Sequence, residues 1–137
     1  MSSAKLTLAA TAVVAGVIGA WGIQTLEAQQ PPAFKRTPLQ KQELTAQGRE
    51  AVQVIAEFAP GAAAGKHTHP GEELGYVMEG TLELEIQGKP PVTLKAGDAF
   101  FVPAGAVHDA KNVGKGPLKV LATYIVEKGK PVSTPAK

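Results

Sequence analysis

The chain has 137 residues, which is enough for one domain with a single hydrophobic core. Hydrophobic residues make up 44% and charged residues 19%, a composition that is ordinary for a globular protein and argues against a disordered chain. A formal charge of only +2, with no basic cluster, argues against a nucleic-acid partner. The absence of cysteine excludes disulfides, thiolate metal ligands, a thiol nucleophile and a lipoprotein anchor.

Residues 1–28 are typical of an export signal. Lys5 precedes an uncharged, apolar run over residues 6–26, and Ala20-Trp21-Gly22 fits a small-x-small cleavage site, with Leu26-Glu27-Ala28 as a second candidate. Roughly 20 uncharged residues also suffice to cross a bilayer, so an uncleaved anchor helix is the alternative, and only that alternative implies contact with a membrane. In both cases we expect the folded domain outside the cytoplasm, in a bacterial periplasm.

Residues 29–50 are polar and contain Pro31, Pro32 and Pro38, so we expect an N-terminal arm with one short strand near residues 34–39. Apolar side chains alternate over residues 51–58, which predicts the first strand of a domain over residues 51–127. Short strands are expected at residues 66–69 and 73–78, the second ending in a hairpin turn at Glu79-Gly80.

Residues 81–87 also alternate, with Leu82, Leu84 and Ile86 expected to face inward. Further strands are expected at residues 92–94, 99–102, 107–111 and 118–126, and residues 128–137 are expected to form a flexible tail. About nine short strands with many turn signals predict an all-β fold. One inward face carrying polar side chains suggests a closed or double-sheet barrel.

Residues 118–126 are apolar on both faces of the predicted strand. Val120, Ala122, Tyr124 and Val126 share one face, and Leu121 and Ile125 share the other. An antiparallel sheet usually leaves one face to water, so the second apolar face predicts a homodimer or larger assembly. The alternative is that the arm at residues 34–39 covers this face within the same chain.

Three polar side chains have the spacing of a metal site. His67 and His69 are two residues apart in a predicted strand, so both imidazoles point to one side. After the turn at Pro70-Gly71, Glu73 brings a carboxylate back to the same point, with Glu72 as its competitor. Two imidazoles and a carboxylate suit a divalent transition metal. The alternative is that these histidines are scattered and the carboxylate is exposed.

His108 lies in a second motif, and the two stretches together resemble the two signature motifs of the cupin superfamily. The first reads Gly, five residues, His-x-His, three residues, Glu, six residues, Gly. The second reads Gly, five residues, Pro-x-Gly, two residues, His, three residues, Asn. The matching positions are Gly61, His67, His69, Glu73, Gly80, Gly97, Pro103, Gly105, His108 and Asn112. The resemblance implies a jelly-roll β-barrel in which His67, His69, Glu73 and His108 hold one divalent transition metal per chain: Fe, Mn, Ni, Cu, Co or Zn.

The pattern is similar to quercetin-dioxygenase-like cupins, which implies a metal-dependent oxygenase acting on a small organic substrate, with Glu73 as the group that accepts a proton. A non-catalytic exported module that binds a metal or small ligand is the alternative.

For the residues around the predicted metal site, the sequence leaves open whether they form a pocket or serve only the packing and curvature of the strands. Gly75 either leaves room beside the metal or eases strand curvature. Val77, Leu82, Leu84 and one of Phe100 and Phe101 either line a pocket or only pack the core. The side chains of Tyr76 and Asp109 are expected to point away from the site.

Overall fold

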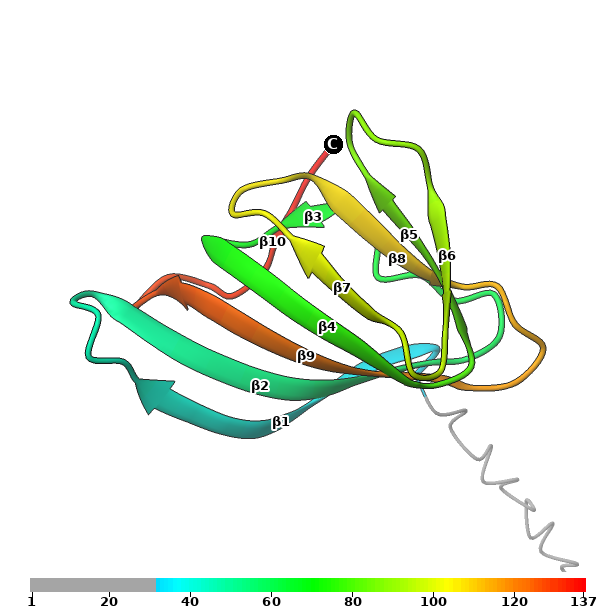
Figure 1. Ribbon diagram of the computed structural model, residues 1–137, viewed down its shortest axis with the longest axis horizontal. Coiled ribbons are helices and arrows are strands. Elements are labelled where there is room, and N and C mark those ends of the chain that lie inside the picture. The colour runs from blue at the N-terminus through cyan, green and yellow to red at the C-terminus, as the bar shows by residue number, and fades with distance from the viewer. Residues whose placement is uncertain (1–31) are drawn as a thin grey trace, which may run out of the picture.

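A computed structural model describes residues 32–137 (Figure 1). The signal or anchor predicted over residues 1–28 lies outside the described residues. Within residues 32–137, no helix is long and apolar enough to cross a membrane.

The described residues form ten strands in two antiparallel sheets, which confirms the all-β prediction (Figure 1). The first sheet runs in the order β1 (Phe34–Glu43), β2 (Arg49–Phe58), β9 (Leu118–Glu127), β4 (Gly71–Glu79) and β7 (Ala99–Val102). The second runs in the order β10 (Thr134–Pro135), β3 (His67–Thr68), β8 (His108–Asn112), β5 (Thr81–Ile86) and β6 (Val92–Lys95). Apart from the pairs β1–β2 and β5–β6, neighbours in both sheets are far apart in sequence, as in a jelly-roll barrel.

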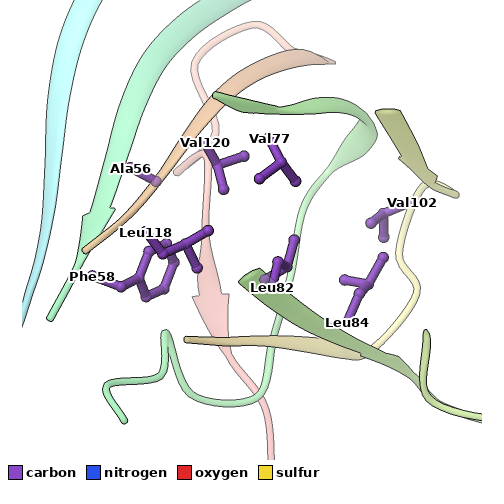
Figure 2. Packing of buried hydrophobic residues seen from close by; sticks show 8 residues of the cluster. All are labelled: Ala56, Phe58, Val77, Leu82, Leu84, Val102, Leu118 and Val120. Carbon is purple, nitrogen blue, oxygen red and sulfur yellow. The ribbon is translucent and has the colours of Figure 1, made fainter. Parts of the chain in front are cut away.

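The hydrophobic core lies between the two sheets because alternate side chains of each strand point inward. Figure 2 shows side chains of β2, β4, β7 and β9, from the first sheet, gathered with those of β5, from the second. The buried cluster consists of Ala56, Phe58, Val77, Leu82, Leu84, Val102, Leu118 and Val120. Strand β9 alternates along its whole length between buried and half-buried residues, as predicted.

Asn112, the last motif position, is fully buried and fixes the end of β8. Its Nδ2 donates to the carbonyl oxygens of Phe58, at 3.1 Å, and Gly116, at 2.8 Å, while its Oδ1 accepts from the backbone N–H of Gly114 at 2.9 Å. One amide therefore joins the end of β2 to the turn that leads into β9.

The turn at Glu79-Gly80 is not a hairpin, so that prediction was wrong. Strand β4 pairs with β7 and β9, whereas β5 pairs with β6 and β8, so the turn passes the chain from one sheet to the other. Gly80 has φ +87°, and a Cβ there would lie 2.4 Å from the carbonyl oxygen of Pro117. Apolar side chains alternate on both sides of Gly80. The same pattern is expected whether the turn joins two paired strands or passes the chain from one sheet to the other, which explains the error.

The N-terminal arm is a longer strand than predicted. Strand β1 pairs with β2 from Phe34 to Glu43, with a bulge between Pro38 and Gln40. Its side chains are mostly exposed, so no alternation marked it in the sequence. Because β1 extends the edge of the first sheet, it does not cover the outer face of β9, so the arm does not play the covering role considered above.

The segment expected as a flexible tail contributes a strand. Thr134 and Pro135 of β10 pair with Thr68 and His67 of β3, and Figure 1 shows β10, in red, beside β3. Val132 packs against the buried cluster around Val126. Strand β10 was not predicted because residues 128–137 are polar, and a two-residue edge strand needs few apolar side chains.

We propose that the outer face of the first sheet binds a second copy of the chain. Leu74 of β4 and Phe101 of β7 are cross-strand partners, 49% and 53% exposed, and Tyr76 lies beside Leu121 of β9. Apolar side chains thus continue across three strands, and contiguous patches of this kind mark interfaces.

We expect light scattering at tens of micromolar to report a dimer. Phe101→Glu is expected to give a monomer, whereas Val92→Glu on the other sheet leaves the mass unchanged. A strict monomer for the unmodified protein would contradict the proposal.

Candidate metal centre

All three histidines meet inside the barrel. His67 lies in β3, His69 directly follows it, and His108 begins β8, where it is the cross-strand partner of His67. The ring centroids are 4.2 Å apart for His67 and His108, 4.8 Å for His67 and His69, and 4.9 Å for His69 and His108. One ring nitrogen of each lies within 4.8 Å of the others, and all three residues are buried.

Backbone carbonyls fix the tautomer of each ring. The Nδ1 of His67 lies 2.6 Å from the carbonyl oxygen of Gly65, that of His69 lies 2.5 Å from Val132, and that of His108 lies 3.0 Å from Ala106. A carbonyl oxygen only accepts, so each Nδ1 carries a hydrogen. A neutral ring then has its lone pair on Nε2, whereas a ring that donates to Glu73 is protonated on Nε2 as well. Metal-bound histidines are commonly held in this way.

Glu73 reaches the cluster from β4, in the facing sheet. Its Oε2 lies 3.1 Å from Nε2 of His69 and 3.2 Å from Nε2 of His108. Glu73 is buried, whereas Glu72 points to the other side of the strand and is half-buried. The structure thus brings together the four side chains that the sequence singled out, and three imidazole nitrogens with a carboxylate oxygen fit a divalent transition metal.

The electrostatics of the four side chains follow from burial and mutual contact. Burial opposes the charge of Glu73, but hydrogen bonds from His108 and His69 outweigh it, and the pKa of Glu73 falls to about 2. Burial disfavours protonated His108 too, yet the hydrogen bond to Glu73 raises its pKa. Burial lowers the pKa of His67 to about 4. At neutral pH the cluster therefore holds a carboxylate anion and a neutral His67 with a free Nε2 lone pair.

A narrow apolar cavity adjoins the cluster, and the space in it that a water-sized molecule can reach is about 20 Å³. His67, Glu73 and His108 line one part of it, and Leu82, Leu84 and Phe100 line another. Phe100 is therefore the inward phenylalanine and Phe101 the outward one. A Cβ on Gly75 would lie 2.0 Å from Cζ of Phe100, so the ring fills the space that Gly75 leaves. Of the two alternatives for Gly75, open room beside a metal therefore does not hold, because Phe100 occupies that space.

Two residues near the centre were not predicted as site residues. Tyr124 is the cross-strand partner of Glu73, and its ring centroid lies 4.5 Å from that of His69. Burial, together with the charge of Glu73, raises the pKa of Tyr124 to about 12, so its hydroxyl keeps the proton. Arg36 of β1 lies near Tyr124 and lines the same cavity. The inward parity of Tyr124 was visible in the sequence, but Arg36 belonged to a segment taken as a linker.

Tyr76 and Asp109 lie as predicted. Tyr76 is exposed on the outer face of β4, and the carboxylate of Asp109 accepts the backbone N–H of Ala110 at 2.8 Å. Neither side chain takes part in the cluster.

Removal of residues 131–137 is expected to weaken metal binding by roughly 10- to 100-fold, because supporting partners of metal-bound histidines contribute about that much. The deletion takes away the Val132 carbonyl that orients His69 and the β10 strand beside His67. Competition with a chelator measures the affinity. Val132→Ala, which keeps the carbonyl, is the matched control and should bind nearly as the unmodified protein does. Unchanged affinity after the deletion would contradict this role of Val132.

The two-sheet barrel with a buried histidine cluster defines a small protein of the double-stranded β-helix class. The family model for the cupin domain matches residues 54–134, more than half of the chain, and the protein belongs to the cupin family.

Relatives and solved structures agree with this assignment. A germin-like protein (subfamily 2 member 2) of Arabidopsis thaliana is 40% identical over 73 residues, which cover 50% of this chain and 33% of the relative. A recombinant oxalate oxidase in complex with glycolate is 25% identical, with a TM-score of 0.62 over 78% of this chain and 57% of the other. An uncharacterised double-stranded β-helix protein of Klebsiella pneumoniae is 22% identical, with a TM-score of 0.63 over 79% of this chain and 90% of the other.

Proposed function

We propose that His67, His69, His108 and Glu73 hold one divalent transition metal per chain, and that the protein is a metal-dependent enzyme of the oxidase or oxygenase type acting on a small organic acid. The observation that carries the proposal is the convergence of three imidazole nitrogens and one Glu73 oxygen from both sheets on a buried point. Coordination at that point leaves positions for a substrate, since four protein ligands do not fill a six-coordinate shell.

The bound ion would supply Lewis acidity and redox chemistry at this point. The residues of the chain would do the remaining work. Glu73, a carboxylate at neutral pH, can accept a proton from a substrate held beside it. Tyr124 keeps its proton and can donate a hydrogen bond. Leu82, Leu84 and Phe100 keep water away from the reacting atoms.

The cavity limits the substrate to a small molecule. Space of about 20 Å³ holds a water or two and, with modest side-chain movement, a short acid, whereas a flavonol needs the barrel to open. The oxalate oxidase with the same fold is described in complex with glycolate, which is a two-carbon acid. Size and this relative therefore favour a short carboxylic acid over the larger substrates of quercetin-dioxygenase-like cupins.

The same narrow cavity supports a second candidate, which is a non-catalytic module that binds a metal or a small ligand. The enzyme and a metal-binding module share the metal and differ in turnover.

Metal analysis by mass spectrometry, followed by oxygen-electrode assays of the loaded protein with glycolate, oxalate and flavonols, tests the proposal. About one ion per chain with oxygen uptake on a short acid is the expected result. One ion per chain without turnover of any substrate favours the binding module, and no bound metal contradicts both the enzyme and a module that binds a metal.

We further propose that the protein is exported, with the folded domain in the periplasm. The apolar, uncharged run after Lys5 supports this proposal. Fractionation of cells, with N-terminal sequencing of the mature protein, distinguishes cleavage near residues 22–28 from an uncleaved anchor. Recovery of full-length protein in the soluble cytoplasm would contradict export.

A further inference from the structure

Arg36 brings a positive charge from the N-terminal strand to the cavity beside the metal centre. Its cross-strand partner is Ala56 of β2, and both residues line the cavity together with His67 and Glu73. The guanidinium carbon lies 4.7 Å from the ring centroid of Phe34, which supports the side chain from one side. Arg36 is half-buried, so it lies where the cavity meets solvent.

The charge of Arg36 is not neutralised within the described residues. Its neighbour Lys35 pairs with Glu57 at 3.6 Å and Lys41 pairs with Glu50 at 3.0 Å, but none of the ion pairs within residues 32–137 includes Arg36. A guanidinium has five N–H donors, and none of the side-chain hydrogen bonds within residues 32–137 includes Arg36. Donors therefore remain for a ligand.

Tyr124 completes this arrangement. Both residues line the cavity, the guanidinium can only donate, and the phenol O–H of Tyr124 can donate as well, so the two side chains together offer donors to an anion. Tyr124 is also the cross-strand partner of Glu73 and packs on the ring of His69. The pair Arg36–Tyr124 thus lies directly beside the four predicted metal ligands.

We propose that Arg36 and Tyr124 form an anion subsite that selects substrates carrying a carboxylate, with Arg36 as the residue that sets specificity. This inference rests on the proposed function, because the remainder of the acid would lie at the centre formed by His67, His69, Glu73 and His108. The planar fork of arginine matches the two oxygens of a carboxylate, and a single cation in a mostly apolar cavity rejects neutral and cationic molecules. A short acid would extend from the Arg36–Tyr124 pair to the metal centre.

Calorimetric titration of glycolate, and of its neutral analogue glycolamide, into the full chain tests the subsite. Each titration is made with and without bound metal, on the unmodified protein, Arg36→Gln, Arg36→Lys and the control Lys35→Gln. We expect Arg36→Gln to weaken glycolate binding by roughly 10- to 100-fold, which is the usual effect of losing a hydrogen bond to a charged group. Arg36→Lys keeps the charge without the fork and should lose less. Lys35→Gln should bind as the unmodified protein does, because Lys35 is exposed on the opposite face of β1.

The outcomes separate the subsite from the metal centre. Metal content unchanged in Arg36→Gln, with glycolate affinity lost and glycolamide affinity unaffected, supports the subsite. Equal glycolate affinity in Arg36→Gln and the unmodified protein, both with and without metal, overturns it while leaving the proposed function intact. Failure of the metal-loaded, unmodified protein to bind glycolate at all also overturns it. Absence of bound metal contradicts the proposed function, and the metal-free titrations still decide whether Arg36 binds the anion.

Discussion

The double change His67→Ala, His69→Ala is expected to reduce the metal content from about one ion per chain to background. Two of three imidazoles disappear, and the two side chains that remain, Glu73 and His108, already contact each other at 3.2 Å. A histidine and a carboxylate on opposite sheets make a weak site for a transition metal, since affinity depends on ligand number and fixed geometry. Mass spectrometry of the metal content, after dialysis against a weak chelator, measures the effect.

Thr68→Ala is the matched control for this double change. Thr68 lies between the two histidines, so its side chain points to the other face of β3, and its removal should leave the metal content unchanged. Thermal unfolding of the metal-free proteins checks that the alanines have not unfolded the barrel. A metal content near one per chain in a folded double variant would show that the ion lies elsewhere, and would end the assignment of His67 and His69.

The site was predictable from sequence where side-chain parity and spacing decide it. His67 and His69 share a face because they are two apart in a strand, and Glu73 shares a face with Gly75 and Val77 for the same reason. The core positions Leu82, Leu84 and Val120 follow from the same alternation. His108 was predicted as a ligand only from the resemblance to the cupin motifs, because no local sequence pattern connects it to His67 and His69.

Features that depend on contacts between distant segments were not predictable. The carbonyl of Val132 orients His69 from 63 residues away, and a backbone group leaves no signal in a sequence. Arg36 lies on an edge strand whose exposed side chains do not alternate. Gly75 indicated that a side chain was missing, but only the packing of Phe100 shows what fills the space.

The change Glu73→Gln is expected to damage turnover more than metal binding, provided that the protein is an enzyme. Glutamine keeps the shape of the side chain and offers one carbonyl oxygen, while His67, His69 and His108 remain to hold the ion. The change removes a negative charge and a basic oxygen. A general base is typically worth roughly 10²–10⁴-fold in rate, so activity per bound metal should fall by about that factor. Metal affinity should fall much less, because three of the four ligands are untouched.

The comparison requires metal content and oxygen uptake to be measured on the same samples, with Glu72→Gln as the control. Glu72 precedes Glu73 on β4 but points to the other side of the sheet, so its neutralisation tests for a general effect of charge. Equal activity per bound metal in Glu73→Gln and the unmodified protein would remove Glu73 from the chemistry and leave it as a ligand alone. Activity in neither protein, with Fe, Mn, Ni and Cu each loaded and across short acids and flavonols, would instead establish that the centre binds a metal without turnover. In that case the low pKa of Glu73 serves only to supply the negative charge that a divalent ion requires in a buried site.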